Sequence, residues 1–272
     1  MILYITNSRS NGREYINPDF YETARNYEEI VFISKEDIYK YDLTKVSSIV
    51  RPTEYIGELA QATNPEVKLF NRKIPALVCD DKWLSFLECK KFNFPQSNTS
   101  LNYKDFEFPM IMKVRDSSFA KHVWLVNNEE EIKMIKITLD EARRNKILYQ
   151  EFVKGSWGES LRVLCIDKKV RFYYYRVNDS DFRANINQGA HVVCMNELDE
   201  KIKELCEDVC EKLDLNYVGI DILFDEEKNP VICELNSNAL THGYRDYTGV
   251  DIQEWYVKYL VELDREFMKG KL

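Results

Sequence analysis

The sequence lacks the features that mark several common classes of protein. Its three histidines, His122, His191 and His242, are too far apart in the sequence to suggest a zinc site. The seven cysteines form no C-x-x-C pair and most stand beside apolar residues, which favours small buried side chains in a reducing cytosol. No stretch approaches the roughly 20 apolar residues of a membrane span, and the opening apolar run is too short for a signal peptide. We therefore expect a cytoplasmic protein.

Positive charge is also in deficit, with 38 basic against 46 acidic residues and a net charge of −8. This balance disfavours a general binder of nucleic acid or of anionic membranes, although a local basic cleft could still hold a phosphate. The 272 residues exceed the usual size of one domain, and the chain has no internal repeat or low-complexity tract. We expect an α/β (α+β) protein in three parts: a small N-terminal α/β domain (1–78), a central part (79–150) and a C-terminal part (151–272).

Apolar runs and turn signals predict the elements of the first two parts. The expected N-terminal strands are 1–5, 30–33 and 47–52, with helical segments such as 18–27 between them. A helix is expected to begin near Asp80, whose side chain would cap it, and another to follow Asn128. The expected central strands are 106–114, 122–126 and 147–153.

The C-terminal part is expected to begin with a hairpin of 159–166 and 170–177, followed by a polar loop. An apolar face at helical spacing predicts a helix that follows Asn196 and runs to Leu213. The turn DEEKNP would then join two further strands, and a final helix would span 252–268.

Two carboxylates and an amide mark the last expected hairpin. If Phe224 pairs with Val231, Asp221 lies directly opposite Glu234, and Asn236 shares a face with Glu234 while Cys233 and Leu235 point to the other face. Like charges that face each other across a sheet repel, unless a hard divalent cation such as Mg²⁺ or Mn²⁺ binds between them. An exposed face with ordinary solvated acids is an equally good explanation of the spacing alone.

Five segments resemble, in the same order and with similar gaps, the ATP-grasp ligases. The likeness is greatest to the RimK-type glutamate ligases that modify a ribosomal protein, and glutathione synthetases are more distant relatives. The segments are DDK (80–82), PMIMKV (109–114), QEFV (150–153), DFRANINQGA (181–190) and the pair GIDIL and VICELNSN (219–223 and 231–238). The resemblance covers roughly 79–250. It implies an ATP-grasp fold, in which two α+β subdomains clasp a nucleotide beside the small N-terminal domain.

The resemblance assigns nucleotide-binding roles to four residues. Lys82 and Lys113 would bind the phosphates of ATP, and Glu151 and Phe152 would lie near the adenine. By itself Lys82 fits a surface lysine in the first turn of a helix, and Glu151 fits a solvated acid at a strand end. Lys113 lies within an apolar strand, where an unpaired ammonium would be costly, so a phosphate partner is the better interpretation.

The resemblance also assigns the metal and the catalytic groups. Arg183 would stabilise an acyl phosphate and the tetrahedral species that follows, with Asn185 positioning it and Arg162 a second candidate for the same cleft. Either arginine alone could be a surface charge. The ligands of Mg²⁺ or Mn²⁺ would be Asp221, Glu234 and Asn236.

Two departures from the family pattern concern the phosphates and the ribose. The loop that covers the phosphates is usually rich in glycine, because backbone amides must approach closely, yet 114–123 contains none. Ser117 and Ser118 could supply hydroxyl and backbone hydrogen-bond donors to the phosphates, and Lys121 could supply positive charge. A weakened or differently shaped phosphate-covering loop is an equally good explanation. Family members also carry an acid that contacts the ribose after the hinge, for which Glu159 or Ser160 would have to substitute.

The function implied is that of a Mg²⁺- and ATP-dependent carboxylate–amine ligase that works through an acyl phosphate. Its substrates would be small-molecule or peptide carboxylates and amines, with Arg51 a candidate to meet a carboxylate. A homo-oligomer is compatible with this function, whereas nucleic acid and membranes are not expected partners. The alternatives are a nucleotide-binding regulatory module that has lost ligation, which the glycine-free loop favours, and an ATP-grasp phosphotransferase.

Overall fold

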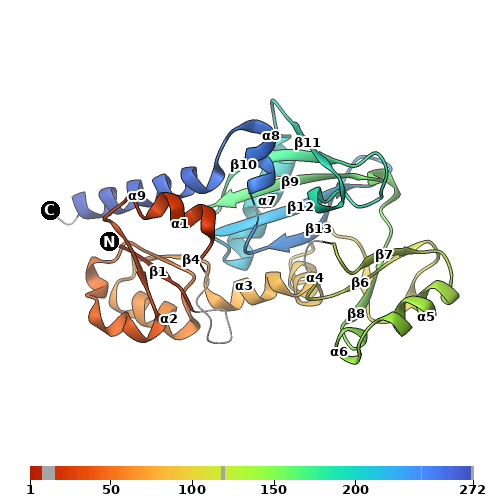
Figure 1. The fold of residues 1–272 in the computed structure, drawn as a ribbon, viewed down its shortest axis with the longest axis horizontal. Helices are drawn as coiled ribbons and strands as arrows, with labels where there is room; N and C mark the ends of the chain where they lie inside the picture. The colour runs from red at the N-terminus through yellow and green to blue at the C-terminus, as the bar shows by residue number, and fades with distance from the viewer. Residues whose placement is uncertain (8–15, 118–119, 240, 271–272) are drawn as a thin grey trace.

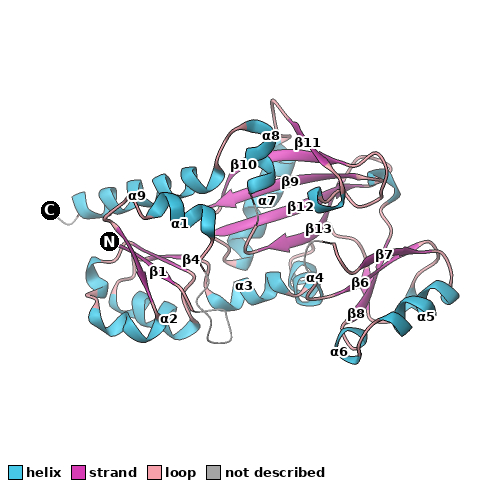
Figure 2. Cartoon of the chain, in the orientation of Figure 1, coloured by secondary structure: helices cyan, strands magenta, loops and turns pink. Residues whose placement is uncertain are grey.

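The computed structural model describes residues 1–7, 16–117, 120–239 and 241–270, and these residues form three β-sheets (Figure 1). The sheets follow one another along the chain, and two helices separate the first sheet from the second (Figure 2). None of the described helices is long and apolar enough to cross a membrane. The five short 3-10 turns among the described residues are Lys35–Lys40, Leu43–Lys45, Tyr103–Asp105, Lys154–Ser156 and Ile186–Gln188.

The N-terminal sheet is parallel, with the strand order β2-β1-β3-β4. Its strands are β1 (Ile2–Ile5), β2 (Ile30–Ile33), β3 (Ser48–Val50) and β4 (Lys68–Phe70). Parallel neighbours need crossover connections, and helices α1 (Pro18–Ala24) and α2 (Glu54–Thr63) supply two of them. The side chains of Asn17 and Thr53 cap these helices. Because β1 lies between β2 and β3, the direction of winding reverses at β1.

The central part begins with two consecutive helices, α3 (Lys73–Asp80) and α4 (Lys82–Lys91). The residue that caps α4 is Asp81 and not Asp80, because the Asp81 carboxylate accepts hydrogen bonds from the backbone of Trp83 and Leu84. An antiparallel sheet of order β5-β8-β6-β7 follows, and one helix packs on it through Ile132. Its elements are β5 (Thr99–Ser100), β6 (Met110–Val114), β7 (Val123–Val126), α5 (Glu129–Thr138), α6 (Glu141–Arg144) and β8 (Ile147–Glu151).

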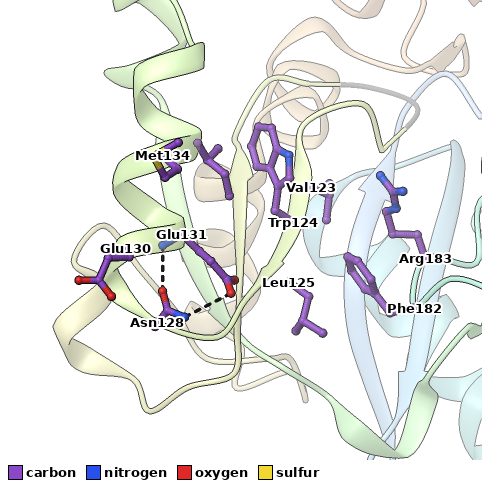
Figure 3. Close-up of a pocket in the computed structure, with 10 residues that line it drawn as sticks. Val123, Trp124, Leu125, Asn128, Glu130, Glu131, Met134, Phe182 and Arg183 are labelled. Atoms are coloured by element: carbon purple, nitrogen blue, oxygen red, sulfur yellow. Dashed lines mark hydrogen bonds between the residues drawn. The ribbon is translucent and has the colours of Figure 1, made fainter.

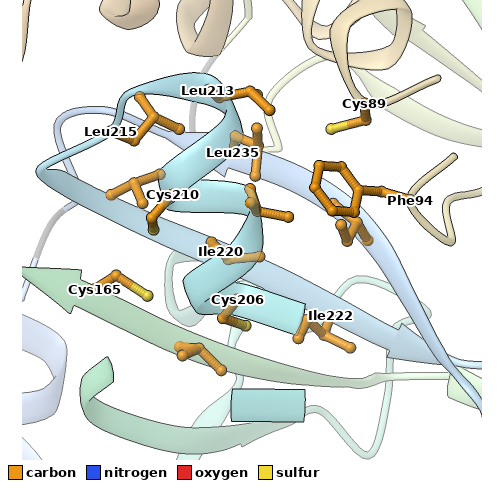
Figure 4. Close-up of a cluster of buried hydrophobic side chains, with 14 of the residues drawn as sticks. Cys89, Phe94, Cys165, Cys206, Cys210, Leu213, Leu215, Ile220, Ile222 and Leu235 are labelled. Carbon is orange, nitrogen blue, oxygen red and sulfur yellow. The ribbon is translucent and has the colours of Figure 1, made fainter. Parts of the chain in front are cut away.

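The C-terminal sheet is antiparallel and five-stranded, in the order β11-β10-β9-β12-β13. Its strands are β9 (Glu159–Ile166), β10 (Lys169–Val177), β11 (His191–Cys194), β12 (Tyr217–Phe224) and β13 (Pro230–Asn236). Helix α7 (Glu200–Leu213) covers one face and buries Cys206 and Cys210 against the strands (Figure 4). The helix begins after Asp199, three residues later than the expected start at Asn196, because the Asp199 side chain supplies the cap. On the opposite face, Leu164, Ile166 and Tyr217 share a buried cluster with residues of the last helix, and Ser160, Arg162 and Asp221 line the cavity described below.

The pairing of β12 with β13 differs from the expected register near the turn. Phe224 pairs with Pro230 and not with Val231, and a β-bulge between Asp221 and Ile222 then shifts the register by one residue. The bulge restores the expected opposition of Asp221 and Glu234. Cys233 is the extra residue, and it lines the cavity described below beside Glu234, so the expectation that it faces away with Leu235 is wrong.

The last helices return the chain to its beginning. Helix α8 (His242–Thr248) leads into α9 (Ile252–Lys269), which packs along α1 (Figure 1). Tyr256 and Leu260 of α9 share a buried cluster with Phe20 and Phe70. The ammonium of Met1 also pairs with the buried Asp264. The division into 1–78, 79–150 and 151–272 stays a prediction, with α9 fastening the third part to the first.

Candidate active site

A cavity of about 790 Å³ lies between the central sheet and the face of the C-terminal sheet that is opposite helix α7. The candidate site residues proposed from the sequence line it, apart from Lys121 and from Ser118, which lies outside the described residues. These are Lys82, Lys113, Ser117, Glu151, Phe152, Glu159, Arg162, Arg183, Asn185, Asp221, Glu234 and Asn236. Lys121 is exposed and is not part of the described lining.

Lys113 is held inside the cavity wall with only 4% of its surface exposed. Its Nζ donates to Oε1 of Gln150 on the neighbouring strand at 2.6 Å, and the Gln150 amide in turn donates to Oγ1 of Thr99 at 3.1 Å. Burial lowers the pKa of Lys113, because the charged ammonium loses the solvation of water. A neutral amide orients this ammonium without cancelling its charge, so the charge remains available to an anion in the cavity.

Lys82 reaches the same cavity from the first turn of α4. Its Nζ donates to the backbone carbonyl of Ser117 at 2.5 Å and pairs with Glu234 at 3.3 Å. The Asp81 carboxylate that caps the helix also pairs with Arg115, which fixes the start of α4 against the end of β6. The side chain of Lys82 is largely buried, so the surface-lysine explanation does not describe it.

Two arginines surround Asp221, whose side chain is 7% exposed. Arg162 of β9 donates through Nε at 2.5 Å and Nη2 at 2.9 Å, and Arg176 of β10 approaches through Nη2 at 2.8 Å. Burial alone would raise the pKa of Asp221, but the two guanidiniums outweigh it and hold that pKa below its usual range. The expectation that Asp221 and Glu234 repel each other until a cation arrives is therefore wrong, because arginines already neutralise Asp221.

A glycine makes room for one of these arginines. A Cβ at Gly219 of β12 would lie 2.8 Å from Nη1 of Arg162 and 2.7 Å from the Cβ of Ala239. Both distances are too short for non-bonded atoms. The glycine in GIDIL thus lets the Arg162 side chain lie flat across β12 to reach Asp221.

Arg176 carries no signal of its own in the sequence, yet it is as buried as Arg162. Its Nε and Nη2 also donate to Oγ of Ser160, at 3.0 and 2.8 Å. Strand alternation was the available signal, since Tyr174 and Arg176 of β10 both line the cavity. The sequence analysis did not single out Gln150 either. It belongs to the QEFV segment, in which the resemblance assigns roles only to Glu151 and Phe152.

Aromatic side chains gather beside the segment that follows β8. The rings of Phe152, Trp157 and Phe182 lie 6.0 to 6.4 Å apart, with Phe152 edge-on to both of the others. The Glu151 carboxylate is exposed and accepts a hydrogen bond from the side chain of Asn98 at 2.9 Å. Glu159 is also exposed, at the start of β9.

Arg183 sits in the polar loop between β10 and β11. It forms two hydrogen bonds with Asp181, which raise its pKa, and its Nη1 donates to the carbonyl of Ala120 at 3.4 Å. Asn178 holds this loop by donating to the carbonyls of Arg183 and Gln188. Figure 3 shows Arg183 and Phe182 facing β7 across a second hollow of about 560 Å³, which Met134 and Glu131 of α5 also line.

In the main cavity, most acidic lining residues are exposed and the basic lining residues lie deeper. Four lining acids are exposed at its rim: Asp80, Asp116, Glu151 and Glu159. The basic lining residues are all buried or half-buried: Arg51, Lys82, Lys113, Arg162, Arg176 and Arg183. Only Asp221 and Glu234 oppose them at that depth among the described lining residues. A protein of net charge −8 therefore encloses a positively charged interior, which favours anionic ligands.

The model of the RimK-like ATP-grasp domain matches residues 93–260. This chain belongs to the RimK-like ATP-grasp family. The chain is 32% identical over 134 residues to an uncharacterized protein of Mycoplasma pneumoniae, the MG012 homolog (49% of this chain, 45% of that protein). It is 29% identical over 147 residues to a probable alpha-L-glutamate ligase of Shewanella pealeana (53% and 31%). The chain thus spans about half the length or less of the curated relatives it matches.

Solved structures confirm the fold class expected for this RimK-like protein. The ATP-grasp ligase PsnB, complexed with a minimal precursor, Mg and ADP, superposes with a TM-score of 0.65 at 13% identity and covers 97% of this chain and 98% of its own. The D-alanine–D-alanine ligase of Bacillus anthracis, complexed with ATP, gives 0.63 at 16% identity and covers 100% and 99%. At these identities the likeness establishes an ATP-grasp fold.

The residues of this RimK-like protein fit a hard divalent cation in their chemistry. Asp221, Glu234 and Asn236 offer only oxygen ligands from two paired strands, as Mg²⁺ prefers. In the described residues no group of three or more histidine, cysteine, aspartate or glutamate side chains gathers as a metal site, so the Asn236 amide is needed to complete the set. The Asn236 amide nitrogen lies 3.5 Å from Oδ2 of Asp221, which joins two of these three side chains.

Proposed function

We propose that this chain is an ATP-dependent carboxylate–amine ligase. The observation that carries the proposal is the convergence, in one cavity, of the buried Lys113 ammonium with the oxygen-rich pair of strands β12 and β13. Neither feature is useful to the fold alone, since a buried lysine without a counter-charge costs stability. Together they suit a nucleoside triphosphate and its divalent cation.

Lys82 and Lys113 bind the phosphates of ATP in this proposal, and the hinge at Glu151 and Phe152 holds the adenine. The aromatic group beside the hinge offers flat apolar surface to a base. Asp221, Glu234 and Asn236 would hold Mg²⁺, which neutralises phosphate charge and polarises the phosphoryl group. Glu159 stays a candidate for the ribose.

The carboxylate substrate must first be activated, because oxide is too poor a leaving group for an amine to displace. A carboxylate oxygen attacks the γ-phosphorus of ATP, the bond to the bridging oxygen breaks, and ADP leaves. The amine then attacks the acyl carbon, a C–N bond forms, phosphate departs and the nitrogen loses a proton. Arg183 contacts the developing oxyanions through its fork of donors, with Asn185 and Arg162 as neighbours in the cavity.

The amine substrate is proposed to be an amino acid. The name of a relative from Escherichia fergusonii, 26% identical over 155 residues, joins ribosomal protein bS6 to L-glutamate. The Bacillus anthracis structure is named for two D-alanines, and PsnB was solved with a precursor peptide. A peptide or a second amino acid is the corresponding carboxylate substrate.

Nucleotide binding is the first test. Mg·ADP at millimolar concentration should raise the melting temperature by several degrees, because a ligand that binds only the native state stabilises it. Either component alone should do much less. An unchanged melting temperature would contradict the nucleotide-binding roles of Lys82, Lys113, Glu151 and Phe152 together.

Ligation is distinguished from mere nucleotide binding by trapping with hydroxylamine. With ATP, Mg²⁺ and a carboxylate substrate, hydroxylamine should replace the amine and give a hydroxamate. Mg·ADP binding without ATP consumption across a broad panel of carboxylates would favour a regulatory module, as the glycine-free 114–123 loop suggests. ATP consumption that yields a stable phosphorylated product would favour a phosphotransferase.

Arg183→Lys should lower ligase turnover about a hundredfold, the lower end of what one lost stabilising donor costs. Lysine keeps the positive charge but lacks the planar, forked set of N–H donors of the guanidinium. Mg·ADP affinity should change little, since other groups bind the phosphates. Normal turnover in the variant would exclude Arg183 from the chemistry, and Arg143→Lys, at an exposed arginine on α6, serves as the control.

A further inference from the structure

One stretch of the cavity wall comes from the N-terminal sheet. Of the described residues before Cys79, Arg51 alone lines the cavity, and it follows the last residue of β3 directly. Because β1 pairs with β2 on one side and β3 on the other, the carboxyl ends of β1 and β3 form the point at which the sheet reverses its winding. Open parallel sheets bind ligands at this point.

The backbone holds Arg51 in an unusual conformation. Its φ is +57°, in the left-handed region that residues with a Cβ seldom occupy. Its N–H nevertheless donates to the carbonyl of Phe70 at 2.7 Å, and Val50 before it is buried. Strained residues of this kind concentrate at binding sites, where surrounding structure fixes the direction of a side chain.

The cavity that Arg51 lines also contains the residues proposed for the metal. Val50 and Ala239 belong to one buried cluster, and Asn236, Ser237 and Ala239 line the cavity in succession. An acid also lies there, since Asp80 lines the cavity and its Oδ1 accepts a hydrogen bond from Oγ of Ser237 at 3.1 Å. A cation and an anion that line one cavity complement the carboxylate and the ammonium of an amino acid.

We propose that Arg51 binds the free carboxylate of the amino-acid substrate and so selects amino acids over simple amines. The proposal rests on the proposed ligase function and names a residue that decides its substrate class. The phosphates have lysines from α4 and β6, whereas Arg51 comes from a different sheet. Its planar fork matches a carboxylate, and such charge-assisted pairs are directional.

Calorimetric titration of the full chain, saturated with Mg·ADP, tests the proposal with the proteinogenic amino acids and their α-carboxamides as probes. At least one amino acid should bind, and its α-carboxamide should bind about 10- to 100-fold more weakly, as expected for a lost charged hydrogen bond. Arg51→Gln should weaken binding of the acid by the same factor and no longer distinguish acid from amide. Arg51→Lys should fall between.

Two further variants serve as controls for this experiment. Arg51→Gly relieves the left-handed backbone, so its melting temperature should not fall below that of wild type although acid binding is lost. Arg25→Gln, at an exposed arginine of the same domain, should bind like wild type. Mg·ADP affinity should be the same in all of them.

Three outcomes would overturn the inference while leaving the ligase proposal standing. These are equal binding of acid and carboxamide by wild type, wild-type acid affinity in Arg51→Gln, and a panel in which Mg·ADP binds but no amino acid does. An Arg51→Gln variant that loses Mg·ADP affinity would instead place Arg51 on the nucleotide and overturn the inference as well. Absence of Mg·ADP binding in wild type would overturn the ligase proposal itself.

Discussion

Glu234→Gln should lower ligase turnover on the order of a thousandfold and leave the protein folded. A cation that stabilises phosphoryl transfer by several kcal/mol is lost with its ligand, and about 4 kcal/mol corresponds to that factor. Glu234 pairs at 3.3 Å with the largely buried Lys82, and glutamine keeps an oxygen that can accept a hydrogen bond from it, so the substitution should lower the free energy of unfolding by about 1–3 kcal/mol. ATP consumption and thermal unfolding measure the two effects.

The dependence of nucleotide binding on Mg²⁺ separates this explanation from a structural one. In wild type, Mg²⁺ should increase the stabilisation that ADP gives, and in Glu234→Gln it should have little effect. Glu227→Gln, at an exposed acid in the turn before β13, serves as the control. A Glu234→Gln protein that unfolds, or one that keeps its Mg²⁺ dependence, would show that Glu234 is not a metal ligand.

Asp221→Asn should destabilise the fold by about 3–5 kcal/mol, because it leaves two buried guanidiniums without their counter-charge. For a chain of this size the melting temperature should fall by roughly 10 °C. The carboxylate has its pKa lowered in the folded protein, so its contribution is present above about pH 4 and is lost as the pH falls further. The difference between wild type and variant should shrink over that acidic range.

A double variant checks the source of the loss. Arg176→Met added to Asp221→Asn removes one of the two guanidiniums left without a counter-charge. It should recover part of the lost stability, since residues in one network do not act additively. If Asp221→Asn is as stable as wild type, or more so, repulsion between the Asp221 and Glu234 carboxylates outweighs the two arginine pairs, and the arginines do not neutralise Asp221.

Local patterns in the sequence predicted most of the elements and the face on which the chemistry gathers. Strand alternation put Glu234 and Asn236 on one side of β13, and a lysine within the apolar MIMKV run indicated an anion partner. The opposition of Asp221 and Glu234 was also predicted, although from a pairing that the bulge at Cys233 corrects. These features depend on neighbours in the chain or across one turn, so the sequence contains the information directly.

What neutralises Asp221 was decided only by the tertiary structure. Arg162 and Arg176 approach it from two other strands, 59 and 45 positions earlier, and Gly219 leaves the space that one of them needs. The same holds for Gln150 beneath Lys113 and for Arg51, which reaches the cavity from a different sheet. An isolated acid and a distant arginine give no signal of each other in the sequence, because their pairing exists only once the sheets are ordered and packed. The sequence determined the fold family and the chemical groups of the site, and the packing of its sheets decided which charges meet.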